Sequence, residues 1–303
     1  MIDGASPGDG GPPEAERART VGWIGLGQMG APMATHLTKG EYGLIVYDTR
    51  AEAVAPLVDL GAKSAAGPAE VARAAQLISV MVRDDDQVDE VAGELIPAAR
   101  PGTVLAIHST IRAETAIRLA ARAQPYGVHV VDAPVSGSFV GATAGSLAVM
   151  VGGTVEAFER CREPFGAWAG LVLHVGPVGA GTHLKLARNL LQFAAFTAAA
   201  EAQRLAEAAG VSLRKLGRVV RHSDAITGGP GSIMLRSSTE PLDPQDPLYE
   251  IMRHVQALGE KDLTLALEMA EGLGVDTPFA RMSLDLFATG LGLAPTPEPT
   301  PPP

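Results

Sequence analysis

The 303-residue chain has few cysteines, no long apolar run and no excess of positive charge. Each of these absences excludes a class of function. A single cysteine, Cys161, excludes an intrachain disulfide and any metal site built from several thiolates. Cys161 lies in the amphipathic stretch 155–165, which favours packing over a role as a nucleophile. No uncharged apolar run approaches the roughly 18 residues that a membrane-spanning helix needs. The formal net charge of −10, with no basic stripe, argues against nucleic acid or an anionic membrane as the main partner.

Motifs of metal and hydrolase chemistry are also missing. The seven histidines are scattered, no two have metal-ligand spacing, and there is no H-E-x-x-H motif, so we expect no bound metal. No G-x-S-x-G motif supports a serine hydrolase. The first 19 residues contain glycine, proline and charged residues without an apolar segment, which predicts no secretory signal and, by default, a cytoplasmic protein.

Two regions of different pattern make up the rest of the chain. Short apolar strands alternate with helices between residues 20 and 178, which is typical of an α/β fold with a mostly parallel, doubly wound sheet of Rossmann type. Residues 179–293 favour helices only, beginning with one long helix at 182–209 that joins the two parts. We interpret 1–19 as a disordered leader and the Pro-rich 294–303 as an extended tail.

The expected elements follow from this periodicity. The predicted strands are 21–26, 42–47, 77–82, 103–107, 128–132, 147–151 and 171–175. The predicted helices are 31–39, 51–60, 68–75, 86–99, 112–124, 155–166, 182–209, 212–222, 231–237, 248–272 and 277–292.

A glycine-rich run directly follows the first strand. Gly25, Gly27 and Gly30 form a G-x-G-x-x-G pattern between a strand and a helix, the setting in which this pattern binds a dinucleotide. The first glycine allows a tight turn, the second allows a pyrophosphate close to the backbone, and the third allows close packing of helix on strand. We expect the pyrophosphate at the helix N-terminus. The cofactor-binding residues predicted in this run are Gly25, Leu26, Gly27, Gln28, Met29 and Gly30.

The second strand ends at an acidic residue, Asp48. A carboxylate roughly 20 residues beyond the glycines can hold the adenosine ribose hydroxyls and repel a 2′-phosphate, which favours NAD over NADP. Thr49 and Arg50 follow at the same strand end. NADP stays open because Arg50 can meet a phosphate, and Asp48 can also be a residue that starts a turn.

Polar residues at later positions are candidates for the substrate site. Lys185 and Asn189 lie four residues apart and share a face of the long helix. A lysine near an oxidised nicotinamide has a lowered pKa and can exchange a proton with a substrate hydroxyl. Ser136 follows a strand and can hold a carboxylate together with nearby N–H groups. A solvated lysine and an ordinary turn are the alternatives.

Two further pairs of polar residues are also candidates. Ser109 and Thr110 follow the strand 103–107 and can meet the nicotinamide ribose, although a turn that caps the next helix is the alternative. Lys261 and Asp262 are, by composition, a charged pair on an exposed helix face.

Taken together and in this order, these segments resemble the β-hydroxyacid dehydrogenase family, whose members include 3-hydroxyisobutyrate dehydrogenases. The resemblance covers about residues 20 to 292 and is carried by GLGQMGAPMATHL (25–37), DAPVSGSFVGA (132–142), GAGTHLKLARN (179–189) and KDL (261–263). It implies a Rossmann domain, a helical domain and a homodimer or homotetramer.

The resemblance also implies roles for single residues. Lys185 is the expected general acid/base and Asn189 its partner in placing the substrate. Ser136 and Gly137, with Ser138 next to them, are expected to bind the substrate carboxylate. Thr110 is expected beside the nicotinamide ribose, and Lys261 beside the cofactor.

Three positions depart from the family pattern, and we expect them to line or approach the substrate pocket. Ser138 stands where a second glycine is common, His108 where an acidic or small polar residue is frequent, and Ile233 where an aromatic residue is frequent. They leave the reaction class intact and the particular substrate open.

The expected activity is hydride transfer between NAD or NADP and a small β-hydroxy carboxylate or its semialdehyde. An imine reductase on the same fold is one alternative, although such enzymes usually carry Asp or Tyr at the position of Lys185. A dinucleotide-binding protein without turnover is the other.

Overall fold

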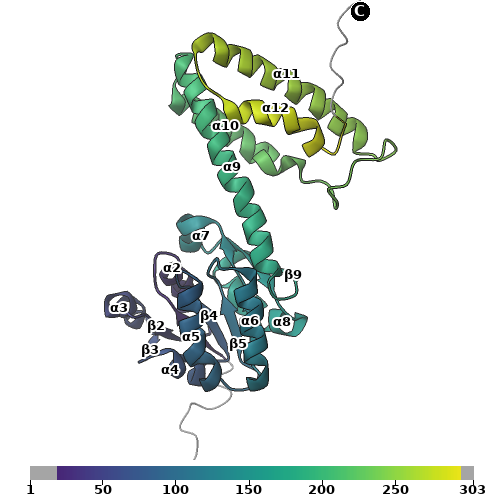
Figure 1. Ribbon diagram of the computed structural model, residues 1–303. Coiled ribbons are helices and arrows are strands. Elements are labelled where there is room, and N and C mark those ends of the chain that lie inside the picture. Colours follow the sequence, from purple (N-terminus) through teal and green to yellow (C-terminus); the bar gives the residue numbers. More distant parts are fainter. Residues whose placement is uncertain (1–18, 295–303) are drawn as a thin grey trace, which may run out of the picture. The chain divides into compact units, whose positions relative to one another are not determined.

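The computed structural model describes residues 19–294 (Figure 1). These residues form two compact units that divide between Arg188 and Asn189, inside one long helix. The first unit contains the sheet, and the described part of the second contains helices only. The predicted leader and tail fall almost wholly outside the described residues.

The first unit is built on one sheet with the order β3-β2-β1-β4-β5-β6-β8-β7, and β9 pairs with β8. Neighbours from β3 to β6 are parallel, whereas β8 runs antiparallel to β6 and β7, which confirms a mostly parallel sheet. The strands are β1 (Thr20–Ile24), β2 (Gly43–Tyr47), β3 (Lys63–Ser64), β4 (Leu77–Val80), β5 (Val104–Ile107), β6 (His129–Asp132), β7 (Val135–Ser136), β8 (Leu147–Gly152) and β9 (Ala169–Gly176).

Helices connect the strands and pack on the sheet. The apolar positions of the α-helices recur at helical spacing, so each α-helix buries one face, whereas none of the three residues of the short 3₁₀ helix η1 is buried. Asp84 begins α5 by accepting a hydrogen bond from the Gln87 N–H at 3.0 Å. The helices of this unit are α2 (Gly30–Leu37), α3 (Ala51–Asp59), α4 (Pro68–Ala74), α5 (Asp85–Ala98), α6 (Ala113–Ala123), η1 (Gln124–Tyr126), α7 (Ser138–Ala144) and α8 (Val155–Gly166).

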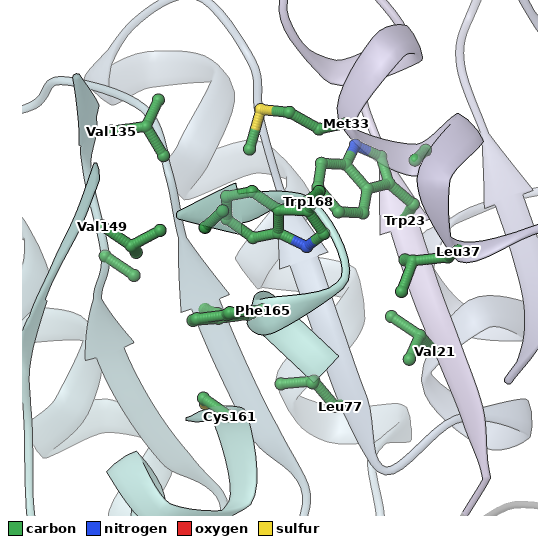
Figure 2. Packing of buried hydrophobic residues seen from close by; sticks show 14 of the residues in the cluster. Val21, Trp23, Met33, Leu37, Leu77, Val135, Val149, Cys161, Phe165 and Trp168 are labelled. Atoms are coloured by element: carbon green, nitrogen blue, oxygen red, sulfur yellow. The ribbon is translucent and has the colours of Figure 1, made fainter. Parts of the chain in front are cut away.

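Successive strand residues face opposite sides of the sheet, and this produces two cores. Val21 and Trp23 of β1 belong to one core and Ile24 to the other. The first core also holds the aromatic side chains of Phe165 and Trp168, and Figure 2 shows Trp168 next to Trp23 and Phe165 next to Trp168. Burial raises the pKa of the Cys161 thiol in this core to about 12, so Cys161 packs as the sequence suggested.

The long helix α9 (Ala180–Ala208) runs from the first unit into the second. The carboxylate of Glu201 in α9 accepts hydrogen bonds from the backbone N–H groups of Phe279 and Ala280, both at 2.9 Å, and so caps the start of the last helix. The other helices of this unit are α10 (Leu213–Thr227), η2 (Gly229–Ile233), α11 (Tyr249–Leu273) and α12 (Pro278–Gly290).

The predicted helix at 231–237 is wrong. The chain forms the short 3₁₀ helix η2, because Gly228 and Gly229 adopt positive φ angles of 88° and 56° that end α10, and helical structure stops at Ile233. None of the helices within residues 19–294 is long and apolar enough to cross a membrane.

Candidate active site

The loop from β1 to α2 brings the backbone close to an open space. Gly25 has a φ of 89°, and its N–H donates to the Tyr47 carbonyl at 3.0 Å. A Cβ at Gly25 would overlap the Met81 carbonyl, and one at Gly30 would overlap the Gly25 carbonyl. A Cβ at Gly27 would meet no atom within 4 Å. Gly25 and Gly30 are therefore required by the protein's own packing, whereas Gly27 leaves room for a ligand.

Asp48 lies at the end of β2 and faces this loop. Its carboxylate accepts hydrogen bonds from the Leu26 N–H at 2.7 Å and from the Arg50 N–H at 2.9 Å. The Arg50 Nε donates to the same carboxylate at 3.2 Å. Burial alone would raise the pKa of Asp48, but these hydrogen bonds hold it below its usual range, so the group is ionised at neutral pH.

A pocket of about 530 Å³ opens at the carboxyl ends of β1, β2 and β4. Ligands of open α/β sheets bind at this edge. The structure therefore brings most of the predicted cofactor residues to one place. The lining residues are Ile24, Gly25, Gly27, Gln28, Met29, Gly30, Tyr47, Asp48, Thr49, Arg50, Pro68, Met81, Val82, Arg83, Gln87, Glu90, Val91 and Glu94.

Part of this lining was missed from the sequence. Arg83 follows β4, and its backbone N–H donates to the Gln87 side chain at 3.0 Å, while its guanidinium pairs with Asp84 at 2.8 Å. The rule that singled out Asp48, a polar residue just past the end of a parallel strand, applies equally to Arg83. Glu90 and Glu94 carried no sequence signal beyond their place on a helix.

Lys185 lies in the second turn of α9, and its side chain is half-buried. Its Nζ donates to the Val135 carbonyl at 2.6 Å. Burial lowers the pKa of Lys185, and the positive charge of Arg188 lowers it further. Asn189 follows one turn later on the same helix. The amine is thus next in space to the segment that contains Ser136.

The segment 135–138 turns sharply beside that amine. Ser136 ends β7, Gly137 has a φ of 135°, and Ser138 has a φ of 58° at the start of α7. A Cβ at Gly137 would come within 2.9 Å of the Leu147 side chain. Glycine is therefore required at 137 by both conformation and space.

Asp132, at the end of β6, was quoted within a motif but given no role from the sequence. Its side chain is wholly buried, and it accepts hydrogen bonds from the Gly179 and Thr182 N–H groups, both at 2.7 Å. It joins the sheet to the first turn of the helix that carries Lys185. An acidic residue at the end of a buried strand was the available signal.

Residues 108–110 divide between core and surface. Thr110 is exposed, and the Ser109 hydroxyl donates to the Val82 carbonyl at 2.7 Å. The expectation that His108 approaches the substrate pocket is wrong, because only 1% of the residue is exposed and its ring stacks on Trp23 at a centroid distance of 5.6 Å. Its ring nitrogens contact the Ala133 carbonyl at 2.8 Å and the Ser79 hydroxyl at 3.0 Å.

Lys261 lies on α11 in the second unit, where its ammonium pairs with Asp262 at 2.9 Å and both side chains are exposed. Its role towards a cofactor stays a prediction. Within residues 19–294, no cluster of three or more His, Cys, Asp or Glu side chains has the arrangement of a metal site.

Two family models match consecutive parts of the chain. Residues 20–176 match the NAD-binding domain of 6-phosphogluconate dehydrogenase, and residues 179–294 match the NAD-binding model of NADP-dependent 3-hydroxyisobutyrate dehydrogenase. The first of these covers more than half of the chain.

Similar proteins agree with these matches. An uncharacterized oxidoreductase of Mycobacterium tuberculosis is 52% identical over 93% of this chain and 95% of its own length. An NAD-dependent L-serine dehydrogenase of Pseudomonas aeruginosa is 34% identical over 89% of this chain and 91% of its own length. The structure of 3-hydroxyisobutyrate dehydrogenase from M. tuberculosis with L-serine has a TM-score of 0.63. Its chain is 30% identical to this one, over 89% of this chain and 92% of its own length.

An imine reductase from Pseudomonas sp. has a TM-score of 0.73 over 90% of this chain and 95% of its own, and this likeness at 22% identity shows a common fold. The glycine-rich pocket, the family models that together span residues 20–294 and the relatives above 30% identity lead to one assignment. This chain belongs to the 3-hydroxyisobutyrate dehydrogenase family of NAD(P)-dependent oxidoreductases.

Proposed function

We propose that the protein oxidises a small β-hydroxy carboxylate, or reduces the corresponding semialdehyde, with NAD as the preferred cofactor. The observation that carries the proposal is the half-buried Lys185 amine, held 2.6 Å from the Val135 carbonyl and adjacent to Ser136. The activities named for relatives, on L-serine and on 3-hydroxyisobutyrate, are of this chemical class.

The pocket fits a dinucleotide. Gly27 leaves space for a pyrophosphate close to the backbone, and Asp48 is an ionised carboxylate suited to ribose hydroxyls. Both support NAD. Arg50 is already paired with Asp48, so a 2′-phosphate would have to compete with that carboxylate for it. When bound, a nicotinamide cofactor supplies the hydride acceptor at ring C4.

Lys185 is proposed to move the proton. In the direction of oxidation, its neutral amine accepts the proton of the substrate hydroxyl, while a hydride leaves the carbon that carries this hydroxyl. A lowered pKa raises the neutral fraction of the amine at physiological pH, and burial is the main cause of that shift. Asn189 is proposed to orient the hydroxyl, and Ser136 with Gly137 and Ser138 to bind the carboxylate.

Steady-state kinetics with a panel of hydroxy acids tests this proposal. The panel includes 3-hydroxyisobutyrate and L-serine, each with NAD and with NADP. Lys185→Ala should lower kcat by about 10²–10⁴-fold, which is the usual contribution of a general acid/base. Lys215→Ala, at an exposed position of α10, is the matched control and should keep the wild-type rate.

The pH dependence gives a second readout. Because oxidation needs the neutral amine, kcat/KM for oxidation should rise with pH and level off above the pKa of Lys185, and the lowered pKa moves that plateau to lower pH. A Lys185→Ala enzyme with near wild-type kcat contradicts the proposal. Turnover of cyclic imines with NADPH but of no hydroxy acid contradicts it as well.

We also propose that the protein forms a homo-oligomer through its helical unit. The buried apolar residues between 189 and 294 are only Met252, Ala270, Ala288, Leu291 and Leu293. Helical units of about 100 residues need a larger core than this to be stable. A second copy of the same chain supplies the missing apolar surface when the two helical units pack together.

A further inference from the structure

A buried carboxylate fixes the start of the helix that carries Lys185. Asp132 is 0% exposed, with Oδ1 accepting from the Gly179 N–H and Oδ2 accepting from the Thr182 N–H, both at 2.7 Å. These donors flank the first turn of α9, where backbone N–H groups have no partner within the helix. Each carboxylate oxygen therefore satisfies one N–H that the helix leaves free.

Two glycines allow this contact to be so close. A Cβ at Gly152, at the end of β8, would overlap the Asp132 carboxylate and lie 2.8 Å from the Gly181 nitrogen. A Cβ at Gly181 would overlap the carbonyl oxygens of Met150 and Asp132. The start of α9 therefore rests directly on the ends of β6 and β8, with no side chain between them. Movement of this turn relative to the sheet would break both hydrogen bonds to Asp132.

The lysine makes a second link between the same two segments. Lys185 is three residues after Thr182, and its Nζ donates to the carbonyl of Val135, three residues after Asp132. The segment 132–136 and the first two turns of α9 are thus joined at two places. One junction is formed by the carboxylate of Asp132 and the other by the amine of Lys185.

From these contacts we propose that Asp132 is a positioning residue, which determines where the Lys185 amine lies relative to Ser136. Its effect on turnover rests on the function proposed above, whereas its effect on the amine does not. Both carboxylate oxygens of Asp132 are needed to hold the start of α9, because each accepts a hydrogen bond from one backbone N–H. An amide at this position keeps one acceptor and points an NH₂ group at the other backbone N–H.

Chemical labelling of lysine tests the proposal without any substrate. In Asp132→Asn without ligand, we expect an amine-specific reagent to modify Lys185 about tenfold faster than in the wild type, because a hydrogen bond to a charged group contributes about this factor. Mass spectrometry of the peptides gives the rate, with exposed Lys39 of the same sample as internal reference. An unchanged rate in folded Asp132→Asn overturns the proposal.

Glu201→Gln is the matched control. Glu201 is also buried and also accepts hydrogen bonds from two backbone N–H groups at a helix start, but it caps α12. We expect this substitution to lower Tm and to leave the Lys185 labelling rate unchanged. Equal acceleration of labelling in both variants would show a general loosening of the fold, and it would overturn the specific role of Asp132.

Kinetics add a readout that depends on the function. With an active hydroxy acid, Asp132→Asn should lower kcat/KM by about 10²-fold, since a shift of a catalytic group by about 1 Å costs this much. The affinity for NADH should be unchanged, because Asp132 does not line the dinucleotide pocket. If the wild type turns over no hydroxy acid, the proposed function fails while the labelling result still decides the role of Asp132.

Hydrogen exchange on the wild type covers the case in which Asp132→Asn does not fold. The Gly179 and Thr182 amides should exchange as slowly as the amides of β6 and β8, because Asp132 holds them in the core. Exchange of these two amides at the rate of an unprotected helix end would overturn the proposal.

Discussion

Burial lowers the pKa of two basic residues, and their surroundings give them different roles. His108 is enclosed by Trp23, Phe165 and Trp168, and both ring nitrogens have partners, so it is part of the core. Lys185 is only half-buried and lies beside the segment 135–138, so it remains available to a substrate. A lowered pKa therefore supports the role proposed for Lys185 only because this group can be reached, which His108 cannot.

The buried imidazole makes stability depend on pH. Burial lowers the pKa of His108 from 6.5 to about 4, so between these values the unfolded chain binds a proton that the folded chain does not. The contribution of neutral His108 to the free energy of unfolding is fully present above pH 6.5 and is lost as the pH falls towards 4. The free energy of unfolding should fall by about 3 kcal/mol through this group.

Urea denaturation of the wild type and of His108→Gln between pH 4 and pH 7 measures this contribution. Glutamine does not titrate, so the variant should lose less stability over that range. The difference between the two curves removes the contribution of the carboxyl groups. Parallel curves would mean that His108 does not titrate in this way.

At the scale of single elements, the loop between β1 and α2 contains glycines that are present for two different reasons. Gly30 is needed by the protein itself, because a side chain there would overlap the Gly25 carbonyl. Gly27 borders open space in the pocket. The sequence motif treats the two positions alike, and only the structure distinguishes them.

Two alanine substitutions test this distinction. Gly27→Ala should change the free energy of unfolding by less than about 0.5 kcal/mol, as at sites without close neighbours, and should weaken NADH binding. Gly30→Ala should lower stability by about 1–3 kcal/mol, the usual cost of overpacking. Denaturation without ligand and fluorescence titration with NADH measure the two effects. Equal losses of stability would contradict the assignment.

The sequence predicted those elements whose apolar pattern is long enough to read. All seven predicted strands are present, with ends shifted by at most two residues. β3 and β7 were missed because each has two residues, too few to show alternation. α7 was missed because its seven residues, SFVGATA, contain a glycine and two β-branched residues that do not favour a helix.

For the candidate site, the sequence predicted the cofactor residues better than the contacts of Asp132. Glycines and strand-end carboxylates have a fixed place in the motif, so most of the predicted cofactor residues lie in one pocket. The contact of Asp132 with Gly179 and Thr182 joins residues about 50 positions apart. No local pattern encodes such a contact, because it depends on how β6, β8 and α9 pack.

At the scale of the whole molecule, the two units differ in how they bury apolar residues. The first has two cores, one on each face of its sheet. In the second, none of the residues Leu213–Thr227 of α10 is buried, although all are described. Large apolar side chains exposed there include Val219 at 66% and Ile226 at 73%. This contrast supports assembly through the helical unit.

A charge on this exposed surface tests the assembly. Val219→Glu should dissociate the oligomer, because it would bury an unpaired carboxylate in an apolar interface. Leu60→Glu is the control, since Leu60 is 54% exposed but lies in the first unit, and it should leave the assembly intact. Sedimentation equilibrium measures both. A monomeric wild type would contradict the proposal, as would an unchanged assembly in Val219→Glu.

Cys161 has a practical consequence for spectroscopy. The chain has no other thiol, and this one is buried with a pKa of about 12, so it resists alkylation at neutral pH. A cysteine introduced at an exposed position would be the sole target of a maleimide dye, without removal of the native residue. One such cysteine in each unit would accept a donor and an acceptor fluorophore, and energy transfer between them would measure the distance between the two units with and without NADH.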